Sequence, residues 1–218
     1  MSARTSRPSA RSRSGWLVVV VLTAFIGYVT LNTLRSDHIG STGLDVGARV
    51  PPFAAPLALG SVEGDVNVAV KRGQGRFGEQ PACRVRGPGI LNSCALGERG
   101  PYVLAFAATR GRQCTGQLDL LQSAQARHPG LQVAAVAIRG DRGGLRALVR
   151  RHGWRFPVAW DHDGILANLF GVAVCPLITY ALPGGVVQAT SVGELDATGL
   201  ERRLARLERA ARATGWRP

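Results

Sequence analysis

The segment that most constrains the fold runs from Pro101 to Leu121. An apolar run from Val103 to Ala108 stops at Thr109, and apolar residues then recur at helical spacing. Short apolar runs bounded by turn residues are typical of buried strands, and a spacing of i, i+4 and i+7 is typical of one helix face. The segment therefore predicts a buried strand, a tight turn and a helix.

Cys114 lies almost at the start of that helix. The first helical turn has unpaired N–H groups and a partial positive charge. These stabilise a thiolate, so thiols in such settings ionise at pH values of roughly 3.5 to 7.5 instead of about 8.5. Arg110 and Arg112 would add positive charge. The alternative is a small buried apolar residue, because Cys114 shares the apolar face of Leu118 and Leu121.

The composition argues for a folded core and against nucleic acid as a partner. The formal charge is +13, but Lys71 is the only lysine among 27 basic residues, and the arginines are spread along the chain. Aromatic residues make up 6%, and they do not alternate with basic residues as in a base-stacking surface. Hydrophobic residues make up 45%, which suits a globular domain.

The N-terminal region predicts an uncleaved membrane anchor. Residues 1–14 form a basic tail that we expect to be disordered and cytoplasmic, and residues 15–35 an apolar transmembrane helix. Four arginines precede the span and only Arg35 follows it, so the remaining chain is expected outside the cytoplasm. A cleaved signal peptide is the competing interpretation, but the apolar run is longer than a usual h-region and no clear cleavage site follows.

After a linker at 36–48, we expect one folded domain at 49–213 with a Gly/Pro/Arg-rich insertion at 72–100. Alternation of apolar residues predicts a β-hairpin at the domain entry, within 46–70. The insertion itself shows little periodicity. The next expected elements, in chain order, are a strand at 131–138, a helix at 142–152, a strand at 156–160, a short helix at 165–170 and two strands joined at Pro183–Gly185. The chain closes with an expected helix that is opened by the capping box of Thr198 and Glu201 and that carries an apolar stripe of Leu200, Leu204, Leu207 and Ala211.

Outside the cytoplasm, the four cysteines are expected as disulfides, and three full pairings are possible. Cys83 and Cys94 lie within the insertion, where a cross-link would remove loop entropy worth about 3 kcal/mol. We therefore predict a structural disulfide between these two residues. The sequence has no CxxC motif, histidine cluster or zinc spacing, so we expect neither a metal nor a cofactor.

The element order predicts an α/β domain with a mixed central sheet and helices on both faces. With Cys114 at a helix start and a proline before the last hairpin, it resembles the thioredoxin-like fold. Within that fold it is similar to the membrane-anchored redoxins of the TlpA/ResA type, relatives of the AhpC/TSA peroxiredoxins. The resemblance covers 46–213, and its most specific pieces are VGARVPPFAAP, VLAFAATRGRQC, FPVAWDHDG and GVAVCPLITYALPGGVV.

The resemblance implies a cis peptide bond before Pro176, across from the active-site helix, with backbone beside it that holds an extended substrate segment. The chain departs from the family at the active-site motif, where Gly111 replaces the first cysteine of W-C-x-x-C and only Cys114 remains. A standard dithiol cycle at this helix is therefore impossible. Cys175, which precedes Pro176, would face the same turn, so we expect it to pair with Cys114.

These residues predict an extracytoplasmic, membrane-tethered thiol-disulfide oxidoreductase or thiol-dependent peroxidase. Cys114 and Cys175 would be catalytic, and Pro176, Arg110, Arg112 and Gly111 would bind substrate. The expected substrate is a protein or low-molecular-weight thiol or disulfide. The alternative, favoured by the lost first cysteine, is a redox-inactive thioredoxin-like module that binds extended protein segments.

Overall fold

The computed structural model describes residues 11–35, 42–71, 78–109 and 111–217, without the side chains of 11–14 and 32–35. Contacts divide the chain into two units, Met1–His38 and Ile39–Pro218. Residues 1–10 of the expected tail and 36–41 of the expected linker lie outside the described residues. The expectation of a disordered tail was wrong for residues 11–14, because the first helix already includes them.

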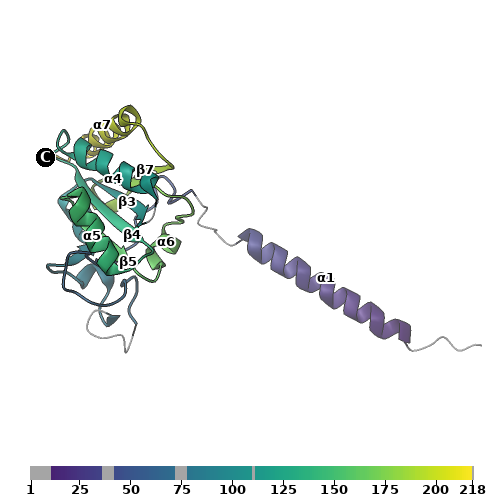
Figure 1. Cartoon of the computed structure of the whole chain (residues 1–218). Helices are drawn as coiled ribbons and strands as arrows, with labels where there is room; N and C mark the ends of the chain where they lie inside the picture. The colour runs from purple at the N-terminus through teal and green to yellow at the C-terminus, as the bar shows by residue number, and fades with distance from the viewer. Residues whose placement is uncertain (1–10, 36–41, 72–77, 110, 218) are drawn as a thin grey trace, which may run out of the picture. The chain divides into compact units, whose positions relative to one another are not determined.

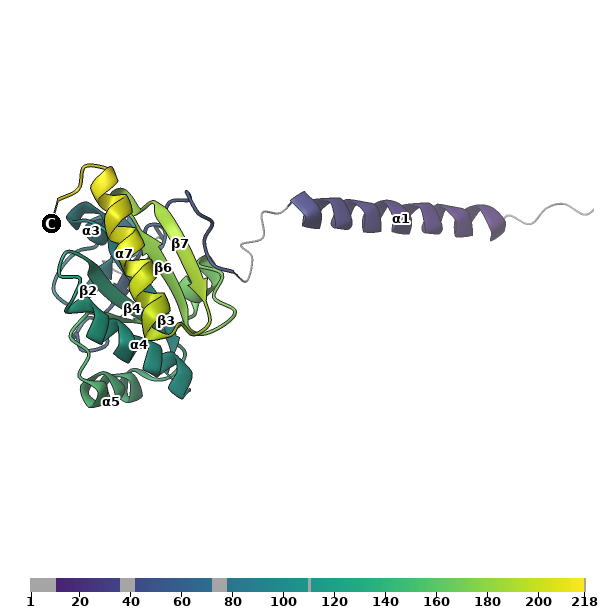
Figure 2. The same cartoon turned by 90° about the horizontal axis from the view of Figure 1, so that it is seen from above.

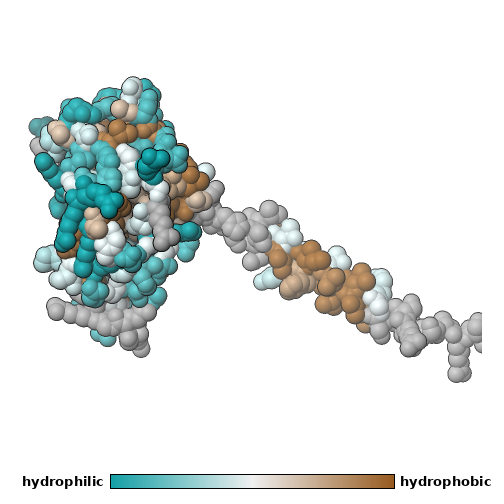
Figure 3. All heavy atoms as spheres, viewed as in Figure 1, coloured by the Kyte–Doolittle hydropathy of each residue, from teal (hydrophilic) through white to brown (hydrophobic). Residues whose placement is uncertain are grey.

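The first unit contains helix α1 (Arg11–Arg35). Its apolar side chains are exposed, as in Trp16 at 70%, and hydrophobic residues occupy the middle of the helix in Figure 3. In the part of the chain that the structure describes, no helix combines the length and apolar character needed to cross a membrane.

The second unit is built around a five-stranded sheet in the order β5-β4-β3-β6-β7. The strands are β3 (Tyr102–Ala108), β4 (Gln132–Ile138), β5 (Val158–Asp161), β6 (Leu177–Ala181) and β7 (Val187–Val192). The first three are parallel, and β6 and β7 are antiparallel to their neighbours (Figure 1). β3 and β4 are covered on both faces, which explains why their sequences are continuous apolar runs.

Helices cover both faces of this sheet, as predicted (Figures 1 and 2). α4 (Arg112–Gln125), α5 (Arg142–His152) and α7 (Ala197–Ala213) contribute to one hydrophobic core, and α3 (Ser93–Arg99) and α6 (Ile165–Leu169) to the other. The apolar stripe of α7 is buried against the sheet, and it consists of Leu200, Leu204, Leu207 and Ala211. The expected stripe is therefore confirmed. A 3-10 turn, η2 (Pro183–Gly185), joins β6 to β7.

The expected entry hairpin was largely wrong. Strand β1 (Ala54–Pro56) pairs antiparallel with β2 (Ile90–Asn92), which comes from the insertion. Within the described residues, the pairing inside the expected hairpin segment is limited to a single antiparallel bridge between Ala54 and Asn67. Apolar alternation specifies that a segment is extended, but the partner strand depends on contacts distant in sequence.

The insertion is more regular than expected, because β2, α3 and the 3-10 turn η1 (Ala82–Arg84) lie within 72–100. The Asn92 side chain holds them together: its Oδ1 accepts from Ala95 N at 3.0 Å, and its Nδ2 donates to the Ala82 and Val85 carbonyl oxygens at 2.7 and 2.9 Å. These elements have three to seven residues. Such lengths are too short for periodicity to reveal. Residues 72–77 lie outside the described residues.

The expected capping box at α7 was also wrong. Asp196 caps the helix, and its Oδ1 accepts from Gly199 N at 2.7 Å. Glu201 instead pairs with Arg127 and His128 after α4, with its Oε2 2.8 Å from His128 Nε2. Glu201 therefore links α7 to the segment after α4, which sequence spacing alone does not reveal.

Candidate active site

Strand register brings Cys175 to the end of β3. Phe106 of β3 pairs with Leu177 of β6, so antiparallel pairing continued by two residues sets Ala108 beside Cys175. The Ala108 N–H donates to Cys175 Sγ at 3.1 Å. The end of β3 therefore positions one sulfur atom of the site.

A short turn at the same end of β3 positions the other sulfur atom. Gly111, the N-cap of α4, has φ +116°, a backbone conformation that favours glycine. A Cβ at this residue would lie 4.0 Å from Cys114 Sγ, so the glycine adjoins the sulfur. The Thr109 hydroxyl donates to the Arg139 carbonyl oxygen at 3.1 Å and ties the turn to the end of β4.

Cys114 and Cys175 form a disulfide, with their Cα atoms 5.7 Å apart. The predicted proximity of the two residues is confirmed. The peptide bond between Cys175 and Pro176 is cis, as the resemblance implied, and Pro176 is buried. Gly111 adjoins the bond, whereas Arg112 is exposed and Arg110 lies outside the described residues.

The two sulfur-bearing residues differ in accessibility. Cys114 is 6% exposed and packs in the core shared by α4 and α7. Cys175 is partly buried and lines a groove of about 500 Å³, together with Ala108 and Val174. The groove therefore opens on Cys175.

The ends of β4 and β5 form the rest of the groove, with Arg139, Asp161 and Asn168 among the lining residues. Asp161 is fully buried, and its carboxylate accepts from Leu166 N at 3.1 Å and Ala167 N at 2.8 Å. Burial raises the pKa of Asp161, and the two hydrogen bonds partly oppose this shift. Sequence reasoning missed these residues, although a polar residue directly after a buried strand was a usable signal for Asp161.

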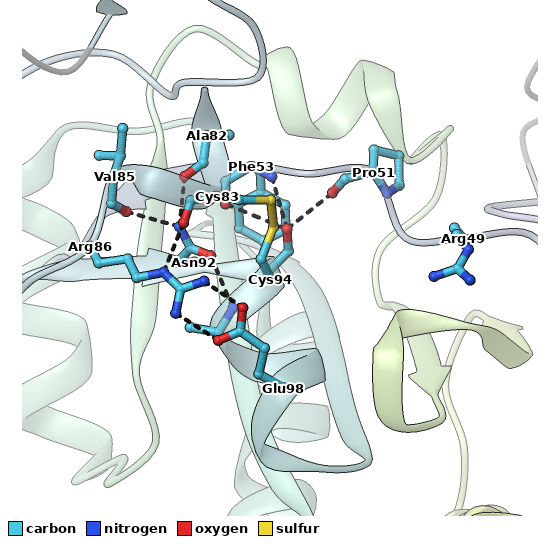
Figure 4. The surroundings of a disulfide bond; sticks show 12 residues. Arg49, Pro51, Phe53, Ala82, Cys83, Val85, Arg86, Asn92, Cys94 and Glu98 are labelled. Carbon is cyan, nitrogen blue, oxygen red and sulfur yellow. Dashed lines mark hydrogen bonds and ion pairs between the residues drawn. A yellow bond between two sulfur atoms is a disulfide. The ribbon is translucent and has the colours of Figure 1, made fainter. Parts of the chain in front are cut away.

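The predicted pair Cys83–Cys94 is also present, with Cα atoms 5.4 Å apart. It joins η1 to α3 and shares no lining residue with the groove at Cys175. Figure 4 shows this second disulfide with Arg86 and Asn92 on one side and Arg49 on the other. Among the described residues, no group of three or more His, Cys, Asp or Glu side chains is arranged to hold a metal ion.

Comparison with known proteins identifies the fold. No protein-family model and no curated protein matches the chain. A Chlorobium tepidum structure assigned as a thiol:disulfide interchange protein DsbE is 22% identical, with a TM-score of 0.56 over 77% of this chain and 98% of that one. A Bacteroides thetaiotaomicron structure assigned as a protein disulfide isomerase is 9% identical, with a TM-score of 0.58 over 78% and 94%.

A third structure, a thiol:disulfide interchange protein of the thioredoxin family from Chlorobium tepidum, is 13% identical, with a TM-score of 0.55 over 75% of this chain and 98% of that one. The domain has a thioredoxin-like fold. At these identities the likeness concerns the fold alone. The chemistry of this thioredoxin-like domain must therefore be inferred from its own residues.

Proposed function

We propose that the protein is a thiol-disulfide oxidoreductase. The observation that carries the proposal is the Cys114–Cys175 disulfide, which joins the first turn of α4 to the residue before Pro176 and has one sulfur beside an open groove. The names of the three similar structures agree with this chemistry.

In the proposed reaction, a substrate thiolate enters the groove and attacks Cys175 Sγ, because Cys175 lines the groove and Cys114 is buried. A bond forms between the substrate sulfur and Cys175 Sγ, the bond between the two cysteines breaks, and Cys114 leaves as a thiolate. A second substrate thiolate then attacks the substrate sulfur of the mixed disulfide and releases Cys175 as a thiolate. The substrate is oxidised and the protein reduced, and the reverse sequence reduces a substrate disulfide.

The start of α4 supports Cys114 as the leaving group. Cys114 is the third residue of the 14-residue helix, so its sulfur lies near N–H groups that have no helical acceptor. A leaving thiolate is stabilised there by the helix dipole, and leaving groups of lower pKa depart faster. Compared with the W-C-x-x-C arrangement, the accessible sulfur has moved from the helix to the residue before Pro176.

Substrate binding is proposed to involve Pro176, Gly111 and Arg112. Pro176 adjoins Cys175, Gly111 adjoins Cys114 Sγ, and Arg112 is exposed in the first turn of α4. A protein or small thiol that approaches Cys175 would pass these residues. Arg110, the fourth residue of this proposal, lies outside the described residues.

Insulin reduction with dithiothreitol tests the proposal. We expect Cys175→Ser and Cys114→Ser to lose the activity of the oxidised full-length protein, since either change removes the exchangeable bond. The matched control is the double variant Cys83→Ser/Cys94→Ser, which should keep it. If the wild type reduced insulin no faster than dithiothreitol alone, the proposal would be contradicted. Consumption of hydrogen peroxide by the reduced protein, without insulin reduction, would favour a thiol-dependent peroxidase.

A redox-inactive binding module is the second candidate, and the burial of Cys114 favours it. An extended peptide would then occupy the groove beside Pro176 without exchange. Peptide binding that is equal in wild type and in Cys114→Ser/Cys175→Ser, together with no exchange activity in the wild type, would support this candidate over the oxidoreductase.

The cellular location is a further proposal: a single-pass cell-membrane protein whose domain lies outside the cytoplasm. Its support is the charge asymmetry around the apolar run and the exposure of side chains such as Phe25 and Ile26 on α1. Flotation with lipid vesicles tests it. The full chain should float and a chain from Ile39 should not, whereas equal behaviour of the two would argue against an anchor.

A further inference from the structure

The Cys83–Cys94 disulfide adjoins a groove of its own. Residues of the domain entry (Arg49, Val50 and Pro52), of α3 and of the turn η2 enclose a space of about 320 Å³. Cys94 of α3 forms part of its wall. Cys83 and Cys94 are both partly buried, so the bond is neither enclosed in the core nor fully exposed. A small molecule in this groove would therefore meet Cys94.

Tyr102 gives the groove an unsatisfied hydrogen-bonding group. Its side chain lines the space and is 0% exposed, and the hydroxyl has no hydrogen-bond partner among the described residues. Burial raises the pKa of Tyr102, so the hydroxyl stays protonated and can donate. Buried polar groups normally have a partner, so this hydroxyl calls for an acceptor from outside the chain.

The rim of the groove favours an anion. Arg49 is exposed there, and its Nη1 donates a long hydrogen bond to the Gly184 carbonyl oxygen at 3.5 Å. It forms no ion pair with any residue that the structure describes. Glu98, the acidic residue of the rim, is already paired with Arg86, whose Nη1 lies 2.6 Å from Glu98 Oε2. The positive charge of Arg49 is thus available to a ligand.

The polypeptide around the disulfide is held in place without the S–S bond. Asn92 binds the carbonyl oxygens on both sides of Cys83, those of Ala82 and Val85, and Arg86 Nε donates to the Cys83 carbonyl oxygen at 2.8 Å (Figure 4). Because these bonds join the η1 turn to α3, opening the disulfide would leave Cys83 close to Cys94. The bond can therefore open and close without unfolding of the region.

We infer that the groove at Cys94 is a second thiol-exchange site, which takes a small thiol bearing a carboxylate. The carboxylate pairs with Arg49 at the rim and also accepts from the Tyr102 hydroxyl at the floor, and the thiolate attacks Cys94 Sγ. A bond forms between the small thiol and Cys94, the Cys83–Cys94 bond breaks, and Cys83 leaves as a thiolate that takes a proton from water. The exchange uses one disulfide and one thiol, so no other oxidant is involved.

This inference does not rest on the proposed function, since each disulfide can be scored separately. The oxidised full-length protein is treated with mercaptoacetate or with neutral β-mercaptoethanol, quenched with acid, and digested for mass spectrometry. The rate of adduct formation at Cys94 with the acidic thiol, divided by the rate with the neutral thiol, gives a selectivity ratio. The variants are Arg49→Gln and Tyr102→Phe, and the matched control is Arg99→Gln, an exposed arginine of α3 that does not line the groove.

We expect adducts at Cys94 in the wild type and in Arg99→Gln, with the same selectivity ratio. In Arg49→Gln and Tyr102→Phe the ratio should fall about fivefold, the effect of one lost polar contact. The absence of an adduct at Cys94, adducts on Cys83 alone, or an unchanged ratio in Arg49→Gln would each overturn the inference. If Tyr102→Phe fails to fold, the exposed Arg49 variant decides the result.

Discussion

Gly111 shows how a single residue shapes the site. It occupies the position of the first cysteine in the W-C-x-x-C motif, and its φ of +116° is one that side chains bearing a Cβ rarely adopt. The chain thus has a turn here that suits glycine and leaves Cys114 as the sulfur of the helix.

Replacing Gly111 by alanine should lower the free energy of unfolding by about 1 to 3 kcal/mol, the range for a strained backbone. A new Cβ would meet only Cys114 Sγ at 4.0 Å, so the cost is conformational and not a clash. Denaturant titration of the oxidised protein measures it. The control is Gly116→Ala within α4, where nothing lies within 4 Å and helix propensity favours alanine. Equal free energies of unfolding for Gly111→Ala and wild type would contradict the prediction that alanine strains the backbone at this residue.

Asp161 makes stability depend on pH. Burial raises its pKa in the folded state, so between the unfolded value of about 3.9 and the raised value the folded protein binds more protons. The Asp161 contribution to the free energy of unfolding therefore falls as pH rises through this window. Asp161→Asn should lack that decline, whereas the exposed control Asp45→Asn should keep it. Denaturant titrations across the window measure both, and parallel curves for Asp161→Asn and wild type would refute the prediction.

At the scale of elements, side-chain caps decide where short helices begin and which helix a residue serves. Asn92 caps α3 and also binds η1, and Asp196 caps α7. Glu201, the fifth residue of α7, joins this helix to the segment after α4. Several polar residues near a helix start have a similar preference for the N-cap position. The residues that surround them in the folded protein determine which one caps the helix.

The cap of α7 can be tested by a pair of substitutions. Asp196→Ala should lower the free energy of unfolding by about 1 kcal/mol, because the Gly199 N–H loses its acceptor. Thr198→Ala should change it little, since Thr198 is exposed and is not the cap. Thermal or denaturant unfolding measures both. If Thr198→Ala lowered the free energy of unfolding more than Asp196→Ala, the result would support the capping box of Thr198 and Glu201 instead.

At the scale of the molecule, the second unit carries both disulfides, both hydrophobic cores and the candidate active site. A chain that begins at Ile39 should therefore unfold cooperatively, with the same denaturant midpoint as the domain in the full chain. A chain that begins at Leu57 lacks Phe53 and strand β1, which pack on the sheet, and should lose the transition. A folded Leu57 chain, or an unfolded Ile39 chain, would contradict this division.

The candidate site was partly predictable. Cys114, Cys175 and Pro176 could be grouped from the sequence, because a strand, a helix start and a proline before a hairpin have fixed places in the fold that the chain resembles. Asp161 and Arg139 were missed, since they reach the groove only when the parallel strands β4 and β5 end at the same edge of the sheet.

The sequence by itself determined the buried strands, the helix that begins near Cys114 and the apolar stripe of α7, because periodicity and turn residues act over a few neighbouring positions. The tertiary structure decided that β1 pairs with β2, that Asp196 caps α7, and that the groove opens on Cys175 while Cys114 is buried. Strand partners and solvent access depend on contacts between residues far apart in the chain. The local sequence pattern does not specify these contacts.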